Sequence, residues 1–170
     1  MDISKDKKIY FASDNHLGAP SYKESRIRER KFILWLESIK EDAEIIFLLG
    51  DLFDFWFEYR SVIPAHGARV IFELHNLVQS GTRVIYLPGN HDIWLGPYLS
   101  EQVGVELPGT SCETTHQNRR LFITHGDRFR HDWKYKISRK ILNFRLCIAL
   151  FRLLHPDIGS WLARTMSRYS

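Results

Sequence analysis

Cysteine is scarce in this sequence, which contains only Cys112 and Cys147 among its 170 residues. Two cysteines cannot build the disulfide framework of a small secreted domain or a zinc site made of cysteines alone. The chain also lacks any uncharged apolar run near the roughly 18 residues of a membrane-spanning helix, and its N-terminus lacks the apolar segment of a signal peptide. These absences predict a soluble protein of a reducing compartment, which we expect to be the cytoplasm.

Hydrophobic residues make up 44% of the chain and charged residues 26%, which excludes disorder and predicts a packed core. The charge is unevenly distributed along the sequence. Residues 1–127 carry 14 lysines and arginines against 18 acidic residues, whereas residues 128–170 carry 10 against 2. Clustered positive charge favours an anionic partner such as phosphate, nucleic acid or a membrane headgroup, although a solvated helical face would show the same pattern.

The apolar pattern predicts alternating strands and helices up to Asp127. An amphipathic helix is expected after the Ser-x-x-Glu capping box at residues 21–24, and a second helix over residues 65–80, with Gly81 as its terminator. Strands are expected at residues 8–13, 44–49 and 83–87, with shorter ones near Val105 and at residues 111–115 and 121–124. The β-α-β-α-β order predicts an α/β fold with layered packing.

Several of these strands lead directly into a small polar cluster. The clusters are Ser13-Asp14-Asn15-His16, Gly50-Asp51-Leu52-Phe53-Asp54, Gly89-Asn90-His91-Asp92 and Thr124-His125-Gly126-Asp127. Any one of them could be a simple turn, because Asp and Asn commonly end strands. In α/β sheets, however, ligands bind beyond the carboxyl ends of the strands, so four such clusters together indicate a shared binding site.

The chemistry that these clusters could share is metal binding. Asp14 and His16 are two residues apart, so an extended segment points both side chains to one side. The Asp51 carboxylate has two oxygens and could bridge two cations, while Asn90 offers a carbonyl oxygen and His125 an imidazole nitrogen. Mixed oxygen and nitrogen ligands favour Mn, Fe or Zn. Two such ions about 3.5–4 Å apart would clamp a phosphoryl group.

The clusters resemble the signature of the calcineurin-like metallophosphoesterases, which reads Asp-x-His, Gly-Asp-x-x-Asp, Gly-Asn-His-Asp and then a later His. The resemblance covers the chain from about Ile9 to Asp127 and implies an αββα sandwich with a dinuclear metal centre at its edge. We expect two divalent ions there, Mn above all, with Fe or Zn as alternatives. The metal ligands that the resemblance implies are Asp14 and His16 for one ion, Asp51 as the bridge, and Asn90 and His125 for the second ion.

The resemblance also implies a catalytic pair. His91 matches the family histidine that stabilises or protonates the leaving oxygen, and Asp54 is placed to orient it. Such a pairing would keep His91 cationic.

Within the family, the segments Gly-Asp-Leu-Phe-Asp-Phe-Trp at residues 50–56 and His-Gly-Asp at residues 125–127 are similar to the hydrolases of UDP-2,3-diacylglucosamine in lipid A biosynthesis. This similarity implies cleavage of a nucleotide-linked glycolipid to UMP and 2,3-diacylglucosamine 1-phosphate. It also implies substrate contacts from Asn90 and from Asp132 and Tyr135, which match an Asp-x-x-Tyr pattern.

Two features depart from that pattern. The best-known members of this enzyme group have Arg where His91 stands, and the family's final Gly-His-x-His is absent from the sequence. We therefore expect a C-terminally truncated sandwich. We expect two parts in the chain. Residues 1–127 would form the N-terminal part of the metallophosphoesterase domain, and residues 128–170 would form a basic amphipathic helical segment that is an insertion or lid.

The helical segment is the expected contact with the lipid. Ile141–Leu154 is strongly apolar, His155-Pro156-Asp157 should break the helix, and a second apolar stripe follows around Trp161. A basic helical hairpin of this kind suits an anionic membrane surface, here the inner face of the cell membrane, or a lid over acyl chains. Alternatively, its apolar residues pack against other parts of the protein. The aromatic residues between Phe53 and Tyr59 could be core, or a wall for a uracil ring or an acyl chain.

Two other functions compete with this hypothesis. A phosphodiesterase or nuclease of the same family would use the basic end to grip nucleic acid, a partner that we expect less than the lipid. A non-catalytic membrane-binding module would carry an incomplete metal site.

Overall fold

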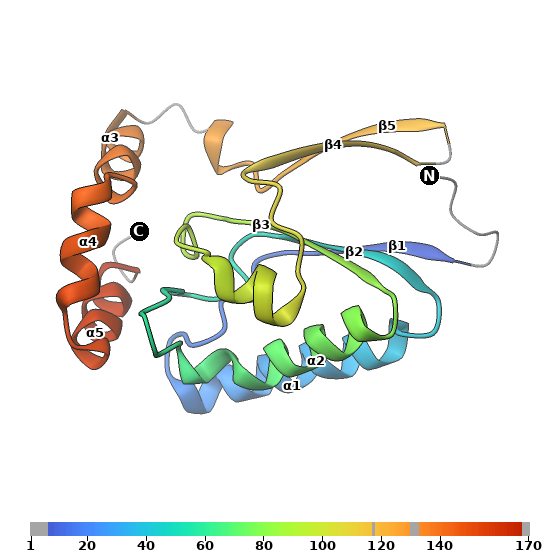
Figure 1. Ribbon diagram of the computed structural model, residues 1–170, viewed down its shortest axis with the longest axis horizontal. Coiled ribbons are helices and arrows are strands. Elements are labelled where there is room, and N and C mark those ends of the chain that lie inside the picture. Colours follow the sequence, from blue (N-terminus) through green and yellow to red (C-terminus); the bar gives the residue numbers. More distant parts are fainter. Residues whose placement is uncertain (1–6, 117, 130–132, 168–170) are drawn as a thin grey trace.

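The computed structural model describes residues 7–116, 118–129 and 133–167. The described strands form a parallel sheet in the order β1-β2-β3 and an antiparallel hairpin, β4-β5. Their bounds are Lys8–Ala12 for β1, Ala43–Leu49 for β2, Arg83–Leu87 for β3, Ser111–His116 for β4 and Arg119–Thr124 for β5. The hairpin lies over one face of the parallel sheet and two helices lie under the other (Figure 1). This arrangement confirms the expected α/β class.

The two covering helices are α1 (Tyr22–Ile39) and α2 (Ala68–Gln79), the latter preceded by a 3₁₀ turn at Ala65–Gly67. The expected capping box forms at the start of α1. The backbone N–H of Glu24 donates to the Ser21 hydroxyl at 3.3 Å, and that hydroxyl donates to the Glu24 carboxylate at 2.7 Å. Ser80 caps the end of α2, and Gly81 follows with a φ of 96°. Glycine adopts this left-handed conformation without steric cost, so it ends the helix as expected.

Strand β2 is buried on both faces because its side chains alternate between two cores. Ile46 and Leu48 join the core beneath the sheet, which contains Leu36 of α1 and Leu74 of α2. Successive strand residues point to opposite faces. The intervening residues therefore enter a second core between the sheets, which comprises Ile45, Phe47, Ile85, Leu87 and Ile123. Each such buried side chain stabilises the fold by about 1.5–3 kcal/mol.

The chain after β3 differs from the expected short strand. Tyr98–Val103 forms a π-helical turn, and the expected strand near Val105 is reduced to a single bridge between Ile85 and Glu106. Two hydrogen bonds hold this bridge, from the Tyr86 N–H to the Glu106 carbonyl and from the Glu106 N–H to the Val84 carbonyl, both at 2.8 Å. Glu106 therefore continues the parallel sheet beside β3 for one residue only.

The C-terminal part folds as α3 (Trp133–Leu142), α4 (Arg145–Leu153) and α5 (Pro156–Ser167), rather than as the expected hairpin of two helices. The additional break occurs at Phe144, whose extended backbone (φ −72°, ψ 128°) caps α4 and separates it from α3. The three helices stand at the end of the molecule to which the β3 strand leads (Figure 1). Within the described ranges, no helix combines the length and the apolar character that crossing a bilayer requires.

Candidate metal centre and adjoining cavity

The parallel register brings the polar clusters together. Ala12 pairs with Leu48, and Leu49 pairs with Leu87, so the loops that follow β1, β2 and β3 leave the same edge of the sheet. The first two loops are joined by backbone hydrogen bonds from Asp14 N–H to the Gly50 carbonyl at 3.2 Å and from His16 N–H to the Asp51 carbonyl at 2.9 Å. The expected convergence of separate loops is therefore what the structure shows.

The residues at this edge of the sheet have unusual backbone conformations and close backbone contacts, which determine where the side chains of the polar clusters lie. Asp14, His16 and Asp51 have positive φ angles of 58°, 45° and 53°, a region that non-glycine residues adopt infrequently. Gly89 approaches Asp51 so closely that a Cβ there would overlap its carboxylate and lie 2.7 Å from its backbone nitrogen. Backbone strain such as that of Asp14, His16 and Asp51 concentrates at functional sites, and position 89 requires glycine for steric reasons.

Asp51 lies between two groups of donor atoms. Its Oδ2 is 3.9 Å from His16 Nε2 on one side and 3.4 Å from His125 Nε2 on the other. Asp14 Oδ1 is 3.9 Å from His16 Nε2, and Asn90 Oδ1 is 3.3 Å from His125 Nε2. Donor atoms at these separations can surround ions about 2.0–2.2 Å from each ligand. All five sequence-predicted metal ligands are thus brought together, and their mixed oxygen and nitrogen chemistry fits divalent transition-metal ions.

The electrostatics of Asp51 and His125 are coupled. Burial by itself would raise the pKa of Asp51, but hydrogen bonds from the His125 ring and the His91 N–H bring that pKa below its ordinary value. The hydrogen bond to Asp51 raises the pKa of His125 to about 9. His125 Nδ1 lies 2.6 Å from the Leu49 carbonyl. Since that carbonyl can only accept, Nδ1 carries a proton and Nε2 is the atom directed at the metal site.

His91 and Asp54 lie together as expected, beside the other groups. His91 Nδ1 is 3.5 Å from Asp54 Oδ1, and hydrogen bonding to Asp54 raises the pKa of His91. The same carboxylate oxygen is 3.8 Å from His16 Nδ1, and the two histidine rings meet edge to face with centroids 4.8 Å apart. His16, Asp54 and His91 also form a compact donor group of their own. The catalytic roles of His91 and Asp54 stay predictions.

Asp92 ends the Gly-Asn-His-Asp cluster, and the sequence pattern assigns it no role of its own. Its carboxylate is fully buried and accepts hydrogen bonds from the N–H groups of Leu52 at 3.0 Å and Gly89 at 2.8 Å, and from the Tyr86 hydroxyl. It therefore joins the loop after β2 to the loop after β3. The signal was the Gly-x-x-Asp spacing, in which an Asp side chain bonds a nearby backbone amide and shapes a turn.

A cavity of about 400 Å³ opens beside these groups. Its polar lining comes from Asp54, Asn90, His91 and Arg139. The remaining lining is mainly apolar and comes from Phe55, Ile93, Trp94, Leu142, Cys147, Phe151, Leu162, Ala163 and Met166. Residues of α3, α4 and α5 thus line this cavity together with Asn90 and His91, and the expected role of the helical segment as a lid stays a prediction.

The chain matches the family model described as calcineurin-like phosphoesterase over residues 7–156. It belongs to this family. The sequence-based resemblance is therefore confirmed, and family membership implies divalent metal ions.

Similar proteins of this phosphoesterase family are hydrolases of one substrate. A protein of Porphyromonas gingivalis named UDP-2,3-diacylglucosamine hydrolase is 35% identical to this chain over 88% of the chain and 58% of the relative. A protein of the same name from Vibrio vulnificus is 32% identical over 84% of the chain and 57% of the relative. The one from Neisseria meningitidis serogroup B is 30% identical over 96% of the chain and 67% of the relative. The chain therefore spans little more than half the length of the first two relatives.

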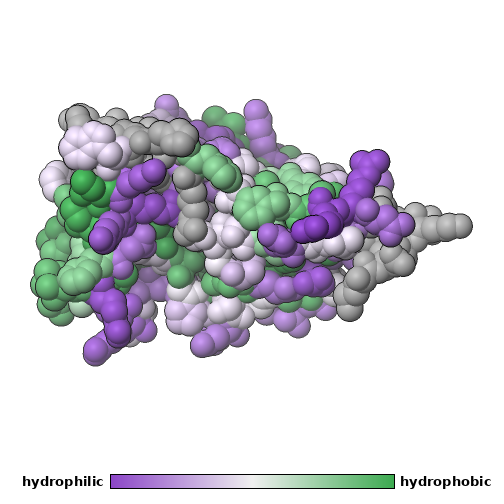
Figure 2. All heavy atoms as spheres, turned by 90° about the horizontal axis from the view of Figure 1, so that it is seen from above, coloured by the Kyte–Doolittle hydropathy of each residue, from purple (hydrophilic) through white to green (hydrophobic). Residues whose placement is uncertain are grey.

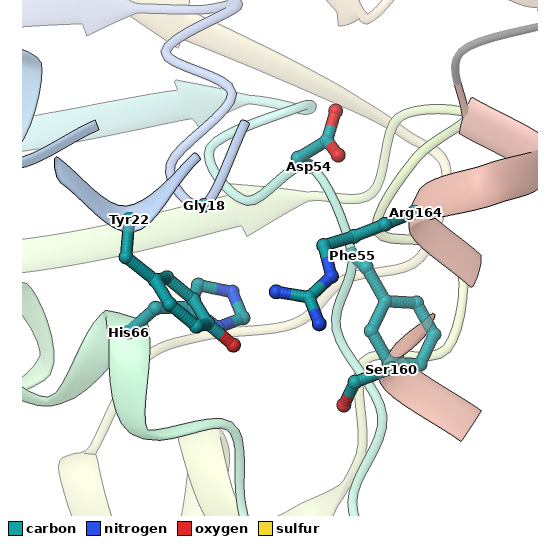
Figure 3. Close-up of a pocket in the computed structure, with 7 residues that line it drawn as sticks. All are labelled: Gly18, Tyr22, Asp54, Phe55, His66, Ser160 and Arg164. Carbon is teal, nitrogen blue, oxygen red and sulfur yellow. The ribbon is translucent and has the colours of Figure 1, made fainter. Parts of the chain in front are cut away.

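A second, much smaller pocket of about 10 Å³ lies where α5 meets the start of α1 (Figure 3). Arg164 reaches from α5 so that its guanidinium lies 5.0 Å from the centre of the Tyr22 ring. His66 lines the same pocket, its Nε2 is buried without a hydrogen-bond partner among the described residues, and burial lowers its pKa. The pocket is about the size of one water molecule.

The aromatic residues after Asp51 divide between the two expected roles. Phe53 and Trp56 are buried in the core beneath the sheet, whereas Phe55 lines the larger cavity. Of the expected substrate contacts, Asn90 lines this cavity as well. Asp132 and the side chain of Tyr135 lie outside the described residues.

Proposed function

We propose that the full-length protein hydrolyses the pyrophosphate bond of UDP-2,3-diacylglucosamine and releases UMP and 2,3-diacylglucosamine 1-phosphate. The observation that carries the proposal is that one cavity is lined both by Asn90 and His91 of the candidate metal centre and by mainly apolar side chains. A glycolipid with a charged pyrophosphate needs both environments side by side. The names of the similar hydrolases support the same substrate.

We assign the ions, for which Mn is our first choice, to Asp14, His16, Asp51, Asn90 and His125. When bound, such a pair of ions supplies Lewis acidity toward the phosphoryl oxygens. His91, kept cationic by Asp54, donates its proton from Nε2 to the oxygen of the departing group. The carboxylate of Asp54 fixes the ring orientation through Nδ1, and the apolar lining excludes water from the rest of the cavity.

We also propose that helices α3–α5 contact an anionic membrane surface on its cytoplasmic side. Several large apolar side chains are exposed on them, among them Phe144, Leu150, Leu153 and Trp161. Arg145 and Arg152 are exposed on the same segment, and Figure 2 shows apolar and charged side chains intermixed at this end of the molecule. Apolar groups that enter the acyl boundary beside cations that meet headgroups are typical of interfacial helices.

Replacing the central carboxylate tests the enzymatic proposal. Full-length protein loaded with Mn²⁺ should release UMP from UDP-2,3-diacylglucosamine dispersed in detergent, and Asp51→Asn should reduce the rate by at least about 10³-fold because both donor groups lose a ligand. Glu113→Gln, which neutralises an exposed carboxylate on β4, should leave the rate unchanged.

Three results would contradict the proposal. Undiminished turnover by Asp51→Asn would remove the bridging assignment. Hydrolysis of DNA or RNA in preference to the glycolipid, with a steep dependence on salt, would establish the nuclease alternative. Binding to vesicles without turnover of any phosphoester would establish a non-catalytic membrane module.

A further inference from the structure

Arg139 lines the larger cavity together with Asn90 and His91 of the candidate metal centre and with the apolar residues of its wall. It is the only lysine or arginine among the described residues that line the cavity. Its side chain, 16% exposed, projects from α3 and forms an ion pair with Asp127, whose side chain is 5% exposed. Asp127 follows the candidate ligand His125 by two residues. The loop that delivers the metal ligand therefore also holds this guanidinium.

The chemistry of the pair suits an anionic ligand. A guanidinium carries five N–H donors in a planar fork, and a carboxylate engages at most two of them in a bidentate pair. The planar fork also matches the oxygens of a phosphate, which a lysine could meet only as a point charge. A carboxylate that fixes the side chain reduces the rotamer entropy lost on binding. Asp127 is thus suited to be a positioning residue for Arg139.

The surroundings of Arg139 indicate which phosphate it meets. Asn90 and His91 line the same cavity, and Leu142, one helical turn after Arg139, belongs to its apolar wall. A ligand that places acyl chains against that wall brings its sugar and the sugar-linked phosphate to Arg139. The nucleotide half of the substrate has no apolar chains, so contacts with the apolar wall do not favour placing it on the Arg139 side of the cavity.

We infer that Arg139, positioned by Asp127, binds the phosphate that stays with the acylated sugar, so that this side of the cavity is a subsite for acylated sugar 1-phosphates. The inference rests on the proposed function for the identity of the lipid. It assigns to the helical segment a direct part in holding the scissile pyrophosphate, in addition to covering it.

Ligand binding without metal tests the inference. Full-length protein kept in EDTA should bind 2,3-diacylglucosamine 1-phosphate about 10- to 100-fold more tightly than the same lipid without its phosphate, as one charge-assisted contact predicts. Calorimetry in detergent would give both dissociation constants. Arg139→Gln should abolish the preference for the phosphorylated lipid, while the matched Arg120→Gln, an exposed charge on β5, should retain it.

Additional variants separate binding from misfolding. Arg139→Lys keeps the charge without the fork and should show an intermediate preference. The double variant Asp127→Asn/Arg139→Gln removes both buried charges, so it should fold as well as Arg120→Gln and still lack the preference. In the metal-loaded enzyme, Arg139→Gln should raise KM more than it lowers kcat, because the contact is made in the ground state.

The outcomes distinguish this inference from the proposed function. A phosphate preference that persists in Arg139→Gln, or that the unmodified protein lacks, would overturn the inference. If the unmodified protein fails to cleave UDP-2,3-diacylglucosamine yet shows the preference and loses it with Arg139, the subsite stands and the proposed reaction is wrong.

Discussion

At the scale of single residues, Asp92 controls the spacing between two loops of the candidate centre. The carboxylate accepts from amides that belong to both loops and from the Tyr86 hydroxyl, and none of these groups is exposed to water. Burial raises the pKa of Asp92. Burial disfavours a carboxylate at this position. Its presence is explained by the buried donors around it, which would otherwise have no hydrogen-bond acceptor.

Asp92→Ala should therefore be strongly destabilising. Leaving several buried donors unsatisfied should lower the free energy of unfolding by about 3–5 kcal/mol, as measured by urea denaturation. Tyr86→Phe removes one of these bonds and should cost about 1 kcal/mol. Equal losses in the two variants would show that the amide bonds to Asp92 contribute little.

Gly89 permits the close approach of Asp51 to the loop after β3. Gly89→Ala should displace the Asp51 carboxylate and weaken binding of Mn²⁺ by at least tenfold, which calorimetry would measure. Gly109→Ala is the control, because Gly109 has a φ of 105° and open space around its Cβ position. It should lower stability by about 1 kcal/mol through backbone strain without changing metal affinity. Unchanged affinity in Gly89→Ala would mean that the loop can shift without disturbing the site.

At the scale of elements, the C-terminal helices are joined to the rest of the fold by a few polar contacts. The Trp94 indole N–H donates to the Leu142 carbonyl at the end of α3 at 3.1 Å, Arg139 pairs with Asp127, and Arg164 of α5 lies over Tyr22. The apolar cluster of Phe55, Phe57 and Phe151 adds a packed contact to α4. These attachments are spaced along the three helices, so each helix has its own.

Arg164→Gln should loosen α5 selectively. Loss of one cation–π contact should weaken its attachment by about 0.5–1 kcal/mol, and hydrogen exchange should become about two- to fivefold faster in α5 while the rate in α2 stays the same. Arg145→Gln, an exposed substitution at the start of α4, is the comparison. If both variants exchange alike throughout α5, the Tyr22 contact does not hold that helix.

The elements differ in how well the sequence predicts them. Strand β3 begins and ends where its apolar run does, and Ser21 caps α1 as expected, because these signals are local. No Gly or Pro stands at the break at Phe144. The apolar pattern of the sequence therefore continues through this position and does not indicate that α3 and α4 are separate helices. The reduced strand at Glu106 depends on pairing with β3, which a local pattern cannot reveal.

The residues of the candidate site also differ in how well the sequence predicts them. Its five expected metal ligands and His91 could be named because their spacing matches a family signature. For Asp92 the sequence indicates only a local turn, through the Gly-x-x-Asp spacing, and for Arg139 it indicates no role, since the importance of both depends on burial and on partners distant in the sequence, Leu52 for one and Asp127 for the other.

At the scale of the whole molecule, lysines and arginines and exposed apolar side chains gather on α3–α5, at one end of the fold. This end also contains the larger cavity, so a lipid drawn from a bilayer would have a short path to it. Water-exposed apolar groups elsewhere are more scattered, as is normal for a protein surface.

Leu153→Glu should weaken binding to vesicles that contain an anionic phospholipid such as phosphatidylglycerol. Leu153 is 82% exposed on α4, and an acidic group there both removes apolar contact and repels the headgroups. A loss of at least about fivefold is expected in a sedimentation assay, since one charge contributes about 1 kcal/mol at such a surface. Phe72→Glu, at a 62% exposed position on α2, should have little effect. Equal losses in both variants would show that α4 is not the membrane contact.

The left-handed backbone angles of Asp14, His16 and Asp51 have a consequence for directed evolution of this protein. Glycine tolerates such angles better than any other residue, and natural proteins often trade heat resistance for activity at sites of this kind. A library of variants sorted for survival at high temperature alone should accumulate glycine at these positions, beginning with His16. Retaining the site would require selecting for turnover in every round.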